Sequence, residues 1–381
     1  MRRRTTVLGG LAFTASLVTA PAAAAAPATA PGAAPAAAPR HDTGPFEKAL
    51  RELADAGASG ISAAVKSPRR GLRTGGVGLA DIRTGRPAVG DEHSRLASNT
   101  KTWTATVVLQ LVGEGRLGLD DTVEDHLPGL IRTRHYDGRE ITVRQLLQHT
   151  SGLPDYLEAP YWEDLEARRW DHFEPLRTVE QALTLPPPER APSGFSYSNT
   201  NYNLAGLIVS EVTGRAIGTE IERRIIRPLG LRHTSWPGDR VALPRPDLRG
   251  YVERKGKLVD KTEWNTSAAD ASGALVSTAA DTTAFWTALW SGRLLAPAQL
   301  AEMRRTVGDG EGGRYGLGVE RYETAPGFVT WGHSGYMETG HKVRNAVTED
   351  GRRAVTLLIG SESFDEDKVD AVVGTLVREL R

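Results

Sequence analysis

Apolar positions recur with two different periods along the chain, and the period predicts where helices and strands lie. Spacings of three and four residues indicate helices over residues 45–53, 98–113, 143–147, 179–183, 203–213, 281–290 and 367–380. Short apolar runs between glycine-rich turns indicate strands over residues 62–65, 72–80, 95–97, 315–321, 329–331 and 354–359. Gly113 and Gly115 stand where the helix that begins at Ser98 is expected to end.

The order of these elements predicts the architecture. Helices cluster in the middle of the chain and strands lie near both ends, with no visible repeat period. We therefore expect one mixed α/β sheet domain into which an all-helical domain is inserted. The sheet part is expected to comprise about residues 45–110 and 275–381, and the helical part about residues 111–274.

The first 44 residues are expected to lie outside the folded domain. Three arginines at positions 2–4 precede an apolar stretch over residues 7–18, which is too short to span a bilayer as a mature helix. We interpret residues 1–26 as an export signal, of the general secretory or the twin-arginine type, and residues 27–44 as an Ala/Pro-rich linker. The mature protein is then secreted, and no later stretch predicts a membrane span.

Composition narrows the classes of partner. The 381 residues are 39% apolar and 25% charged, a balance typical of a globular protein. The 47 basic and 47 acidic residues cancel, so the charge does not indicate a nucleic-acid partner. The chain has no cysteine, which excludes a catalytic thiol, a disulfide scaffold and a thiolate zinc site. None of the nine histidines lies in an H-E-x-x-H or similar cluster, so we expect neither a metal nor another cofactor.

Three short patterns indicate chemistry, and the first is Ser98-Asn99-Thr100-Lys101. At the start of a helix, positions i and i+3 share one face, so the Lys101 amine can reach the Ser98 hydroxyl. A serine is a weak nucleophile and needs a base beside it. A partly desolvated lysine can be that base because burial lowers its pKa. Taken alone, the pattern is equally typical of a surface helix with Ser98 as its N-cap.

The second pattern is Tyr197-Ser198-Asn199. A tyrosine near a lysine ammonium loses its proton more easily and can shuttle that proton between nucleophile and leaving group. The Asn199 amide can bind a substrate amide while it also contacts the lysine. The more frequent role of such a stretch is a Ser/Asn loop that caps the following helix.

The third pattern is His333-Ser334-Gly335. The glycine lets a substrate backbone approach a strand closely, and the Ser334 hydroxyl can donate to a substrate carboxylate or carbonyl. The next backbone amide, that of Tyr336, could pair with the Ser98 amide as an oxyanion hole. The alternative is a β-turn that contains an ordinary histidine.

Each pattern occurs once, and their order resembles that of a known family. The set S-x-x-K, Y-x-N and [KH]-[ST]-G is similar to the motifs of serine-type D-alanyl-D-alanine carboxypeptidases, class C β-lactamases and related esterases and D-amino-acid amidases. The resemblance is closest to the streptomycete exocellular carboxypeptidase type and covers nearly the whole chain from about residue 45. It extends to the segments 109–119, 141–153, 195–201 and 315–318.

This resemblance implies a β-lactamase/penicillin-binding-protein-like fold of the α/β (α+β) class, in which helices flank an antiparallel sheet and an all-helical domain is inserted. It implies an acyl-enzyme on Ser98, with Lys101 and Tyr197 sharing the proton transfers. His333 takes the place that lysine has in many relatives. The substrate-binding residues that it implies are Asn199, His333, Ser334, Gly335 and Tyr336.

One position departs from the carboxypeptidase pattern. The carboxypeptidases that this chain resembles have a basic residue straight after their YGLG-like strand. That residue helps to hold the free carboxylate of the peptide. Here Glu320 stands at that position, with Arg321 next to it, and both are candidates for determining specificity. Neighbouring residues of a strand point to opposite faces, so Arg321 need not replace the missing basic residue. The other candidates for that charge are His341, Lys342 and Arg344.

Three functional hypotheses follow from these residues. The first and favoured one is a D-alanyl-D-alanine carboxypeptidase acting on peptidoglycan-type peptides. The second is an esterase, β-lactamase or D-amino-acid amidase on the same scaffold. The third is an inactive relative that binds penicillin without turnover, against which the intact Ser98, Lys101 and Tyr197 argue. The expected partners are a peptide or other small acyl substrate and β-lactams as covalent inhibitors, and we expect a monomer.

Overall fold

A ten-stranded antiparallel sheet forms the centre of the computed structural model, which describes residues 44–189 and 193–380. The order across the sheet is β3-β2-β1-β14-β13-β11-β10-β9-β8, and β12 pairs with β13 outside this path. Its strands are β1 (Gly60–Ser67), β2 (Gly71–Asp81), β3 (Arg86–Pro87), β8 (Val307–Gly308), β9 (Arg314–Tyr315), β10 (Glu320–Ala325), β11 (Phe328–Gly332), β12 (Gly335–Tyr336), β13 (Lys342–Thr348) and β14 (Ala354–Ile359). The predicted export signal, and all but the last residue of the predicted linker, lie outside the described residues.

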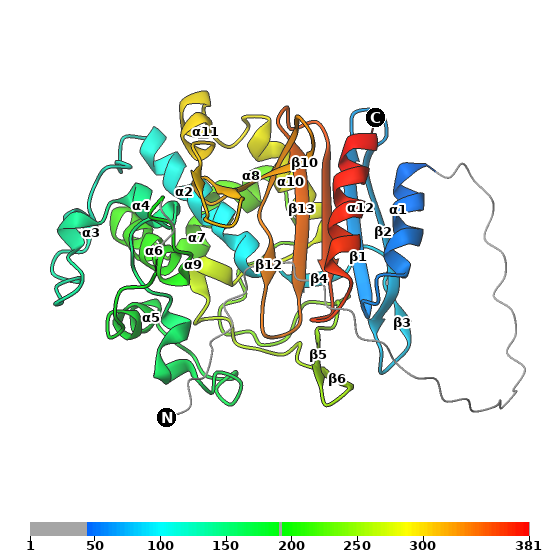
Figure 1. Cartoon of the computed structure of the whole chain (residues 1–381), viewed down its shortest axis with the longest axis horizontal. Coiled ribbons are helices and arrows are strands. Elements are labelled where there is room, and N and C mark those ends of the chain that lie inside the picture. Colours follow the sequence, from blue (N-terminus) through cyan, green and yellow to red (C-terminus); the bar gives the residue numbers. More distant parts are fainter. Residues whose placement is uncertain (1–43, 190–192, 381) are drawn as a thin grey trace, which may run out of the picture.

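Helices cover both faces of this sheet (Figure 1). The helices α1 (Pro45–Ala54) and α12 (Glu366–Glu379) pack on one face, and α10 (Ala279–Trp290) packs on the other. Side chains alternate along the central strands accordingly. Ile61 and Val65 of β1 join the core under α1 and α12, whereas Ala64 joins the core that includes α10. Burial on both faces explains why β14 is almost continuously apolar.

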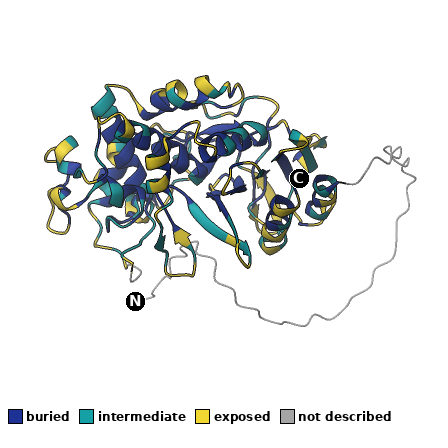
Figure 2. Ribbon diagram, turned by 90° about the horizontal axis from the view of Figure 1, so that it is seen from above, coloured by how far each residue is buried: buried dark blue, intermediate teal, exposed yellow. Residues whose placement is uncertain are grey.

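Most of the other helices gather beside the sheet, on the left of Figure 1. They are α2 (Thr100–Gly113), α3 (Val123–His126), α4 (Val143–Leu147), α5 (Pro175–Ala182), α6 (Asn199–Thr213), α7 (Ile217–Ile221), α8 (Arg227–Leu229), α9 (Asp270–Gly273) and α11 (Pro297–Met303). Trp103 of α2 stacks on Phe285 of α10, with ring centroids 3.8 Å apart. One buried core therefore runs from the helices into the sheet, as the dark blue regions of Figure 2 show.

The predicted antiparallel sheet with flanking helices is confirmed, but three elements need correction. Residues 315–321 are two strands, β9 and β10, separated by a turn in which Gly318 adopts a φ of 75°. The predicted strand at residues 95–97 ends at Arg95, because Ala97 adopts a φ of 47° and begins a turn. The central strand β13 was not predicted at all. The boundaries between sheet and helical parts stay a prediction.

Two further antiparallel strand pairs lie outside the main sheet. They are β4 (His93–Arg95) with β7 (Val276–Thr278), and β5 (Tyr251–Arg254) with β6 (Lys257–Asp260). β4 is important for the site because it leads directly into the turn that carries Ser98. None of the helices in the described part of the chain is long and apolar enough to cross a bilayer.

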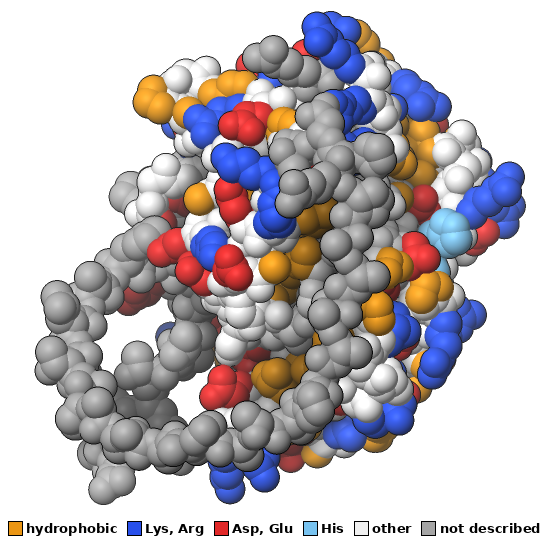
Figure 3. Space-filling model, turned by 90° about the vertical axis from the view of Figure 1, so that its right-hand side faces the viewer, with side chains coloured by type: hydrophobic (Ala, Val, Ile, Leu, Met, Phe, Trp, Pro, Cys, Tyr) orange, Lys and Arg blue, Asp and Glu red, His pale blue; other side chains and the backbone are white. Residues whose placement is uncertain are grey.

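The right-hand edge of the sheet ends in a very short strand. β3 has two residues and includes Pro87, so it offers little backbone for another strand to pair with. Figure 3 faces this side of the molecule, where basic and acidic side chains are interspersed with apolar ones. Leu72 and Val89 are among the large apolar side chains exposed along this edge. An edge of this kind resists the addition of a strand from another chain.

Candidate active site

Ser98 lies in a short 3₁₀ turn, η1 (Ala97–Asn99), directly before α2. Ala97 adopts a left-handed backbone conformation, which redirects the chain sharply between β4 and the helix. Both β12 and α9 pack against this turn. Ser98 keeps partial exposure, whereas Lys101, one helical turn further along, is fully buried. A substrate can therefore reach the hydroxyl while the amine behind it is shielded from water.

The Lys101 amine has three close oxygen neighbours. Its Nζ lies 3.0 Å from Ser98 Oγ, 2.7 Å from Asn199 Oδ1 and 2.9 Å from the backbone oxygen of Ser272. An amide oxygen and a peptide oxygen can only accept hydrogen bonds. A neutral amine, which has two N–H groups, would donate both to Asn199 and Ser272. Its lone pair is then left facing the Ser98 hydroxyl, which is the orientation that a general base requires.

Burial brings this amine close to neutrality at physiological pH. Desolvation lowers the pKa of Lys101 to about 7, while the carboxylates of Asp155 and Glu320 act in the opposite direction. A large fraction of Lys101 is therefore uncharged near pH 7 and able to take the proton from Ser98. The general-base role proposed from the sequence thus has a physical basis in this structure.

This protonation state predicts a pH profile. We expect the rate of acylation by an uncharged amide or ester to rise about tenfold per pH unit below pH 7 and to level off above it. Asp155 raises the pKa of Lys101, so Asp155→Asn should shift the profile to lower pH. Stopped-flow acylation between pH 5.5 and 8.5 measures both curves. A profile that stays flat over this range would show that Lys101 is not the base.

Tyr197 also contacts Ser98. Its hydroxyl shares a hydrogen bond with Ser98, and the Lys101 amine lies 5.0 Å from the centre of its ring. Burial raises the pKa of Tyr197 well above its usual range, and the bond to Ser98 only partly opposes this effect. The easier deprotonation that we expected from the sequence is therefore not favoured. Tyr197 stays a phenol, suited to donate a proton rather than to remove one.

Asp155, which the sequence patterns did not single out, fixes Asn199 in place. Its Oδ2 accepts from the Asn199 side-chain Nδ2 at 2.7 Å and from the Asn199 backbone N–H at 3.0 Å. Asp155 Oδ1 accepts from the backbone of Leu157 and so caps η3 (Tyr156–Glu158). These bonds orient the Asn199 oxygen toward Lys101, which leaves the second hydrogen of Nδ2 for a substrate.

His333 is buried, which favours the neutral form of its ring. Its Nδ1 lies 2.6 Å from the backbone oxygen of Ser334, which can only accept, so this nitrogen carries the proton. Its Nε2 then accepts from the Tyr315 hydroxyl at 2.8 Å. Burial lowers the pKa of His333 below its usual range. The position that is lysine in many relatives therefore supplies no positive charge here.

Glu320 points toward the His333-Ser334-Gly335 strand. Its Oε2 accepts from the Ser334 backbone N–H at 2.9 Å, and its Oε1 accepts from the Ser334 hydroxyl at 3.1 Å. The Glu320 side chain is 20% exposed, so it borders the accessible side of the site. On this side of the site, a substrate therefore meets the carboxylate of Glu320 and not a cation. Within residues 44–189 and 193–380, no group of three or more His, Asp or Glu side chains is placed to hold a metal ion.

The turn that carries Ser98 is tied directly to this strand. Asn99 Nδ2 donates to the His333 backbone oxygen at 2.7 Å and to Asn345 Oδ1 at 2.9 Å. A Cβ atom on Gly335 would lie 2.5 Å from the backbone oxygen of Leu96. The glycine is therefore required for the close approach of the chain's own backbone, a reason different from the substrate contact expected from the sequence.

The register of β12 directs one backbone amide into the site. Met337 N–H donates to His341 O, so the next pair, Tyr336 with Lys342, is not hydrogen-bonded across the two strands. The Tyr336 N–H therefore points away from β13, on the open side of β12. This geometry agrees with the proposed oxyanion hole, in which it would act together with the Ser98 N–H.

The structure brings the three sequence patterns together, and it adds residues to which the sequence analysis gave no role. The additions are Asp155, Ser272, Tyr315, Asn99 and Asn345. Asn99 and Tyr315 lie within segments quoted from the sequence, and Asp155 lies two residues after the family-like segment 141–153. Ser272 contributes only its backbone oxygen, so its side chain carries no signal. Arg321, next to Glu320 on β10, is half-buried and faces the opposite side of the strand.

Comparison with known proteins gives consistent matches. A D-stereospecific amidohydrolase from Streptomyces sp. is 36% identical, with a TM-score of 0.79, over 87% of this chain and 98% of that chain. The D-amino acid amidase from Ochrobactrum anthropi SV3, complexed with L-phenylalanine amide, is 29% identical, with a TM-score of 0.75, over 88% and 97%. Esterase EstB from Burkholderia gladioli is 35% identical over 219 residues, 53% of each chain. The chain spans between 37% and 53% of the length of such curated relatives.

A family model agrees with these matches over almost the whole folded chain. The model described as "Beta-lactamase" matches residues 46–377, from α1 to the end of α12. This range contains the turn with Ser98, the Tyr197 loop and the strand with His333. The chain therefore belongs to the β-lactamase family, the serine hydrolases with a β-lactamase/penicillin-binding-protein-like fold.

Proposed function

We propose that this protein hydrolyses amide or ester bonds of D-configured acyl donors whose leaving group carries no negative charge. The proposal rests on one observation: both the backbone N–H and the hydroxyl of Ser334 donate hydrogen bonds to the carboxylate of Glu320. The hydroxyl and N–H of Ser334 are the groups that a substrate carboxylate would need, and both donate to Glu320. A free-acid peptide would have to displace this carboxylate and then lie beside it, which like charge disfavours.

The cations suggested as replacements are engaged on the other side of the sheet. Lys342 pairs with Glu366 of α12, and Arg344 pairs with both Glu366 and Asp370. His341 is buried, and desolvation lowers its pKa to about 3, so it is uncharged. This arrangement favours an amidase or esterase over the D-alanyl-D-alanine carboxypeptidase that the sequence favoured. The amidase and esterase names of the relatives support the same choice.

The proposed acylation step uses only the residues described. Neutral Lys101 takes the proton of Ser98 Oγ as this oxygen forms a bond to the substrate carbonyl carbon. The N–H groups of Ser98 and Tyr336 stabilise the tetrahedral oxyanion. The bond to the leaving group then breaks, and Tyr197 donates the proton that this group needs, being reprotonated from Lys101. In deacylation these steps run in reverse. A water molecule attacks the acyl carbon, the bond from this carbon to Ser98 Oγ breaks, and the carboxylic acid leaves.

The Glu320 assignment predicts a charge preference that one variant should remove. N-acetyl-D-Ala-D-Ala and its C-terminal amide have the same scissile bond and differ by one negative charge. We expect the wild-type protein to prefer the amide by about tenfold or more in kcat/KM, the effect of a like charge that is partly buried. Glu320→Gln, which keeps the size of the side chain, should reduce this preference to less than about threefold.

Glu323→Gln is the matched control, since it removes an exposed carboxylate from the same strand. It should leave the preference unchanged. A wild-type protein that prefers the free acid, with Glu320→Gln having no effect, would refute the proposal. The carboxypeptidase hypothesis would then hold, with another cation binding the carboxylate.

A further inference from the structure

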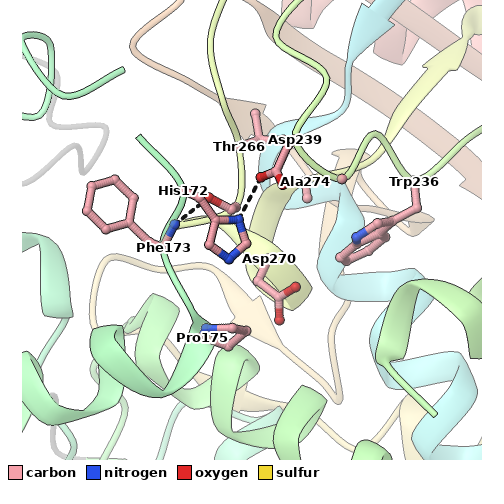
Figure 4. A pocket seen from close by; sticks show the side chains of 10 residues that line it. His172, Phe173, Pro175, Trp236, Asp239, Thr266, Asp270 and Ala274 are labelled. Atoms are coloured by element: carbon pink, nitrogen blue, oxygen red, sulfur yellow. Dashed lines mark hydrogen bonds and ion pairs between the residues drawn. The ribbon is translucent and has the colours of Figure 1, made fainter. Parts of the chain in front are cut away.

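A cavity lies between the start of α5, the 236–239 loop and α9 (Figure 4). Its volume is about 110 Å³, enough for a molecule of several heavy atoms. None of its lining residues belongs to the groups that contact Ser98. They are His172, Phe173, Pro175, Trp236, Gly238, Asp239, Thr266, Ser267, Asp270 and Ala274.

Thr266 brings an unpaired polar atom to this cavity. Its side chain is 2% exposed, and its Oγ1 has no hydrogen-bond partner in the structure. Leaving a buried hydroxyl unpaired costs free energy, so such groups are normally satisfied by protein, water or a ligand. The unpaired oxygen is available to form a hydrogen bond with a molecule in the cavity.

Asp270 brings a carboxylate whose charge the protein does not neutralise. It is the first residue of α9, half-buried, with a φ of 36° that an aspartate tolerates better than most residues. Burial raises the pKa of Asp270 to about 7, and the charged neighbour that acts on it, Glu174, has the same sign. The cation within the cavity wall, His172, is held by Asp239 at 2.6 Å and by Glu174 at 3.1 Å.

The walls of the cavity complete a cation site. Trp236 presents an aromatic ring, as Figure 4 shows, and aromatic faces attract organic cations. The ring of Phe173 points away from the cavity and packs against Trp162. Pro175 and Ala274 add apolar surface, which suits an alkyl chain better than a hydrated metal ion. We propose that this cavity is a second binding site, which takes a small alkylammonium ion with its charge on Asp270 and a hydrogen bond to Thr266.

The site borders the segment that supports the Lys101 amine. α9 has four residues, Asp270–Gly273, and its Ser272 oxygen accepts from Lys101 Nζ at 2.9 Å. The same helix is held to α2 by Thr104, whose hydroxyl donates to the Ala271 oxygen at 2.8 Å. An ion bound at Asp270 therefore acts on the helix that orients Lys101. Its occupancy is expected to change the pH profile of acylation.

n-Propylammonium and its neutral counterpart n-propanol provide a direct test with the whole protein. Calorimetry should show saturable binding of one n-propylammonium per chain and no comparable binding of n-propanol. Affinity should rise several-fold from pH 6 to pH 8 as Asp270 ionises. His172 and Asp239 also line the cavity, and Glu174 contacts His172, so Asp270→Asn is needed to separate the effect of Asp270 from theirs. This variant should weaken binding at least tenfold and remove most of the pH dependence.

Two further variants make the assignment specific. Thr266→Val should weaken binding several-fold, while Glu180→Gln, an exposed acid on the outer side of α5, should leave it unchanged. A crystal grown with n-propylammonium should show the ion between Trp236 and Asp270. Ordered water alone in the cavity, equal binding of n-propanol, or unchanged affinity in Asp270→Asn would each overturn the proposal.

Discussion

Replacing Ser98 with alanine is expected to lower the hydrolysis rate by at least about 10⁴-fold and to abolish covalent labelling. Loss of a serine nucleophile in an acyl-transfer enzyme removes the whole covalent pathway, so the residual rate reflects binding alone. The fold should survive, because the change removes one oxygen from a partly exposed side chain. Intact-mass spectrometry after incubation with a β-lactam or an activated ester measures the adduct directly.

Ser334→Ala is the control for this experiment. Its hydroxyl also lies in the site, but it donates to the carboxylate of Glu320, a much weaker base than the neutral amine beside Ser98. That variant should still be labelled, more slowly, and peptide mapping should place the adduct on Ser98. An adduct on Ser334 or on any other serine would contradict the assignment of the nucleophile.

Removal of Lys101 and of the Tyr197 hydroxyl should each slow acylation by at least about a hundredfold, the scale of lost general acid–base catalysis. The two residues serve one proton path from Ser98 to the leaving group, so their effects should not add. Lys101→Met keeps the volume of the buried side chain, and Tyr197→Phe keeps the ring. The double variant is expected to be within about tenfold of the slower single variant in single-turnover kinetics.

Tyr202→Phe provides a matched comparison. The Tyr202 ring also lies near Lys101, with Nζ 5.6 Å from its centre, but its hydroxyl donates to the Leu147 backbone oxygen. This change should cost less than about tenfold in the acylation rate. A double Lys101 and Tyr197 variant that loses the full product of both single effects would show that the residues act independently.

The parts of the site that lie within one turn of chain could be predicted from sequence. Ser98 and Lys101 are three residues apart, so helix geometry alone brings their side chains together. The contacts of Asp155 with Asn199 span 44 residues, and those of Asn99 with Asn345 span 246. Such pairs depend on how distant elements pack, which local periodicity does not record. Glu320 was a candidate for specificity from the sequence, but its pairing with Ser334 was not predicted, for the same reason.

The same distinction explains which elements were missed. β14 is apolar except for Thr356 and was predicted with its observed bounds, because it is buried on both faces. The neighbouring strand β13 carries Lys342 and Arg344, and these charged residues make its sequence typical of a surface segment although the strand is central. Both side chains reach acids on α12, so their charges are neutralised only in the folded protein. Polar residues inside a sheet are thus hard to interpret before their partners are known.

For protein engineering, the site has a centre that tolerates no substitution, at the contact between Gly335 and Leu96, and a rim that can be varied, at Tyr336 and Glu320. No side chain can replace the hydrogen of Gly335, because the backbone oxygen of Leu96 occupies that space. Substitution at Gly335 therefore cannot be used to change the distance between the two N–H groups of the oxyanion hole. Tyr336 is 48% exposed and Glu320 is 20% exposed, and neither supplies a side chain to the proton path. A directed-evolution library restricted to these two rim positions should therefore change which substrates are accepted while most of its members remain active enzymes.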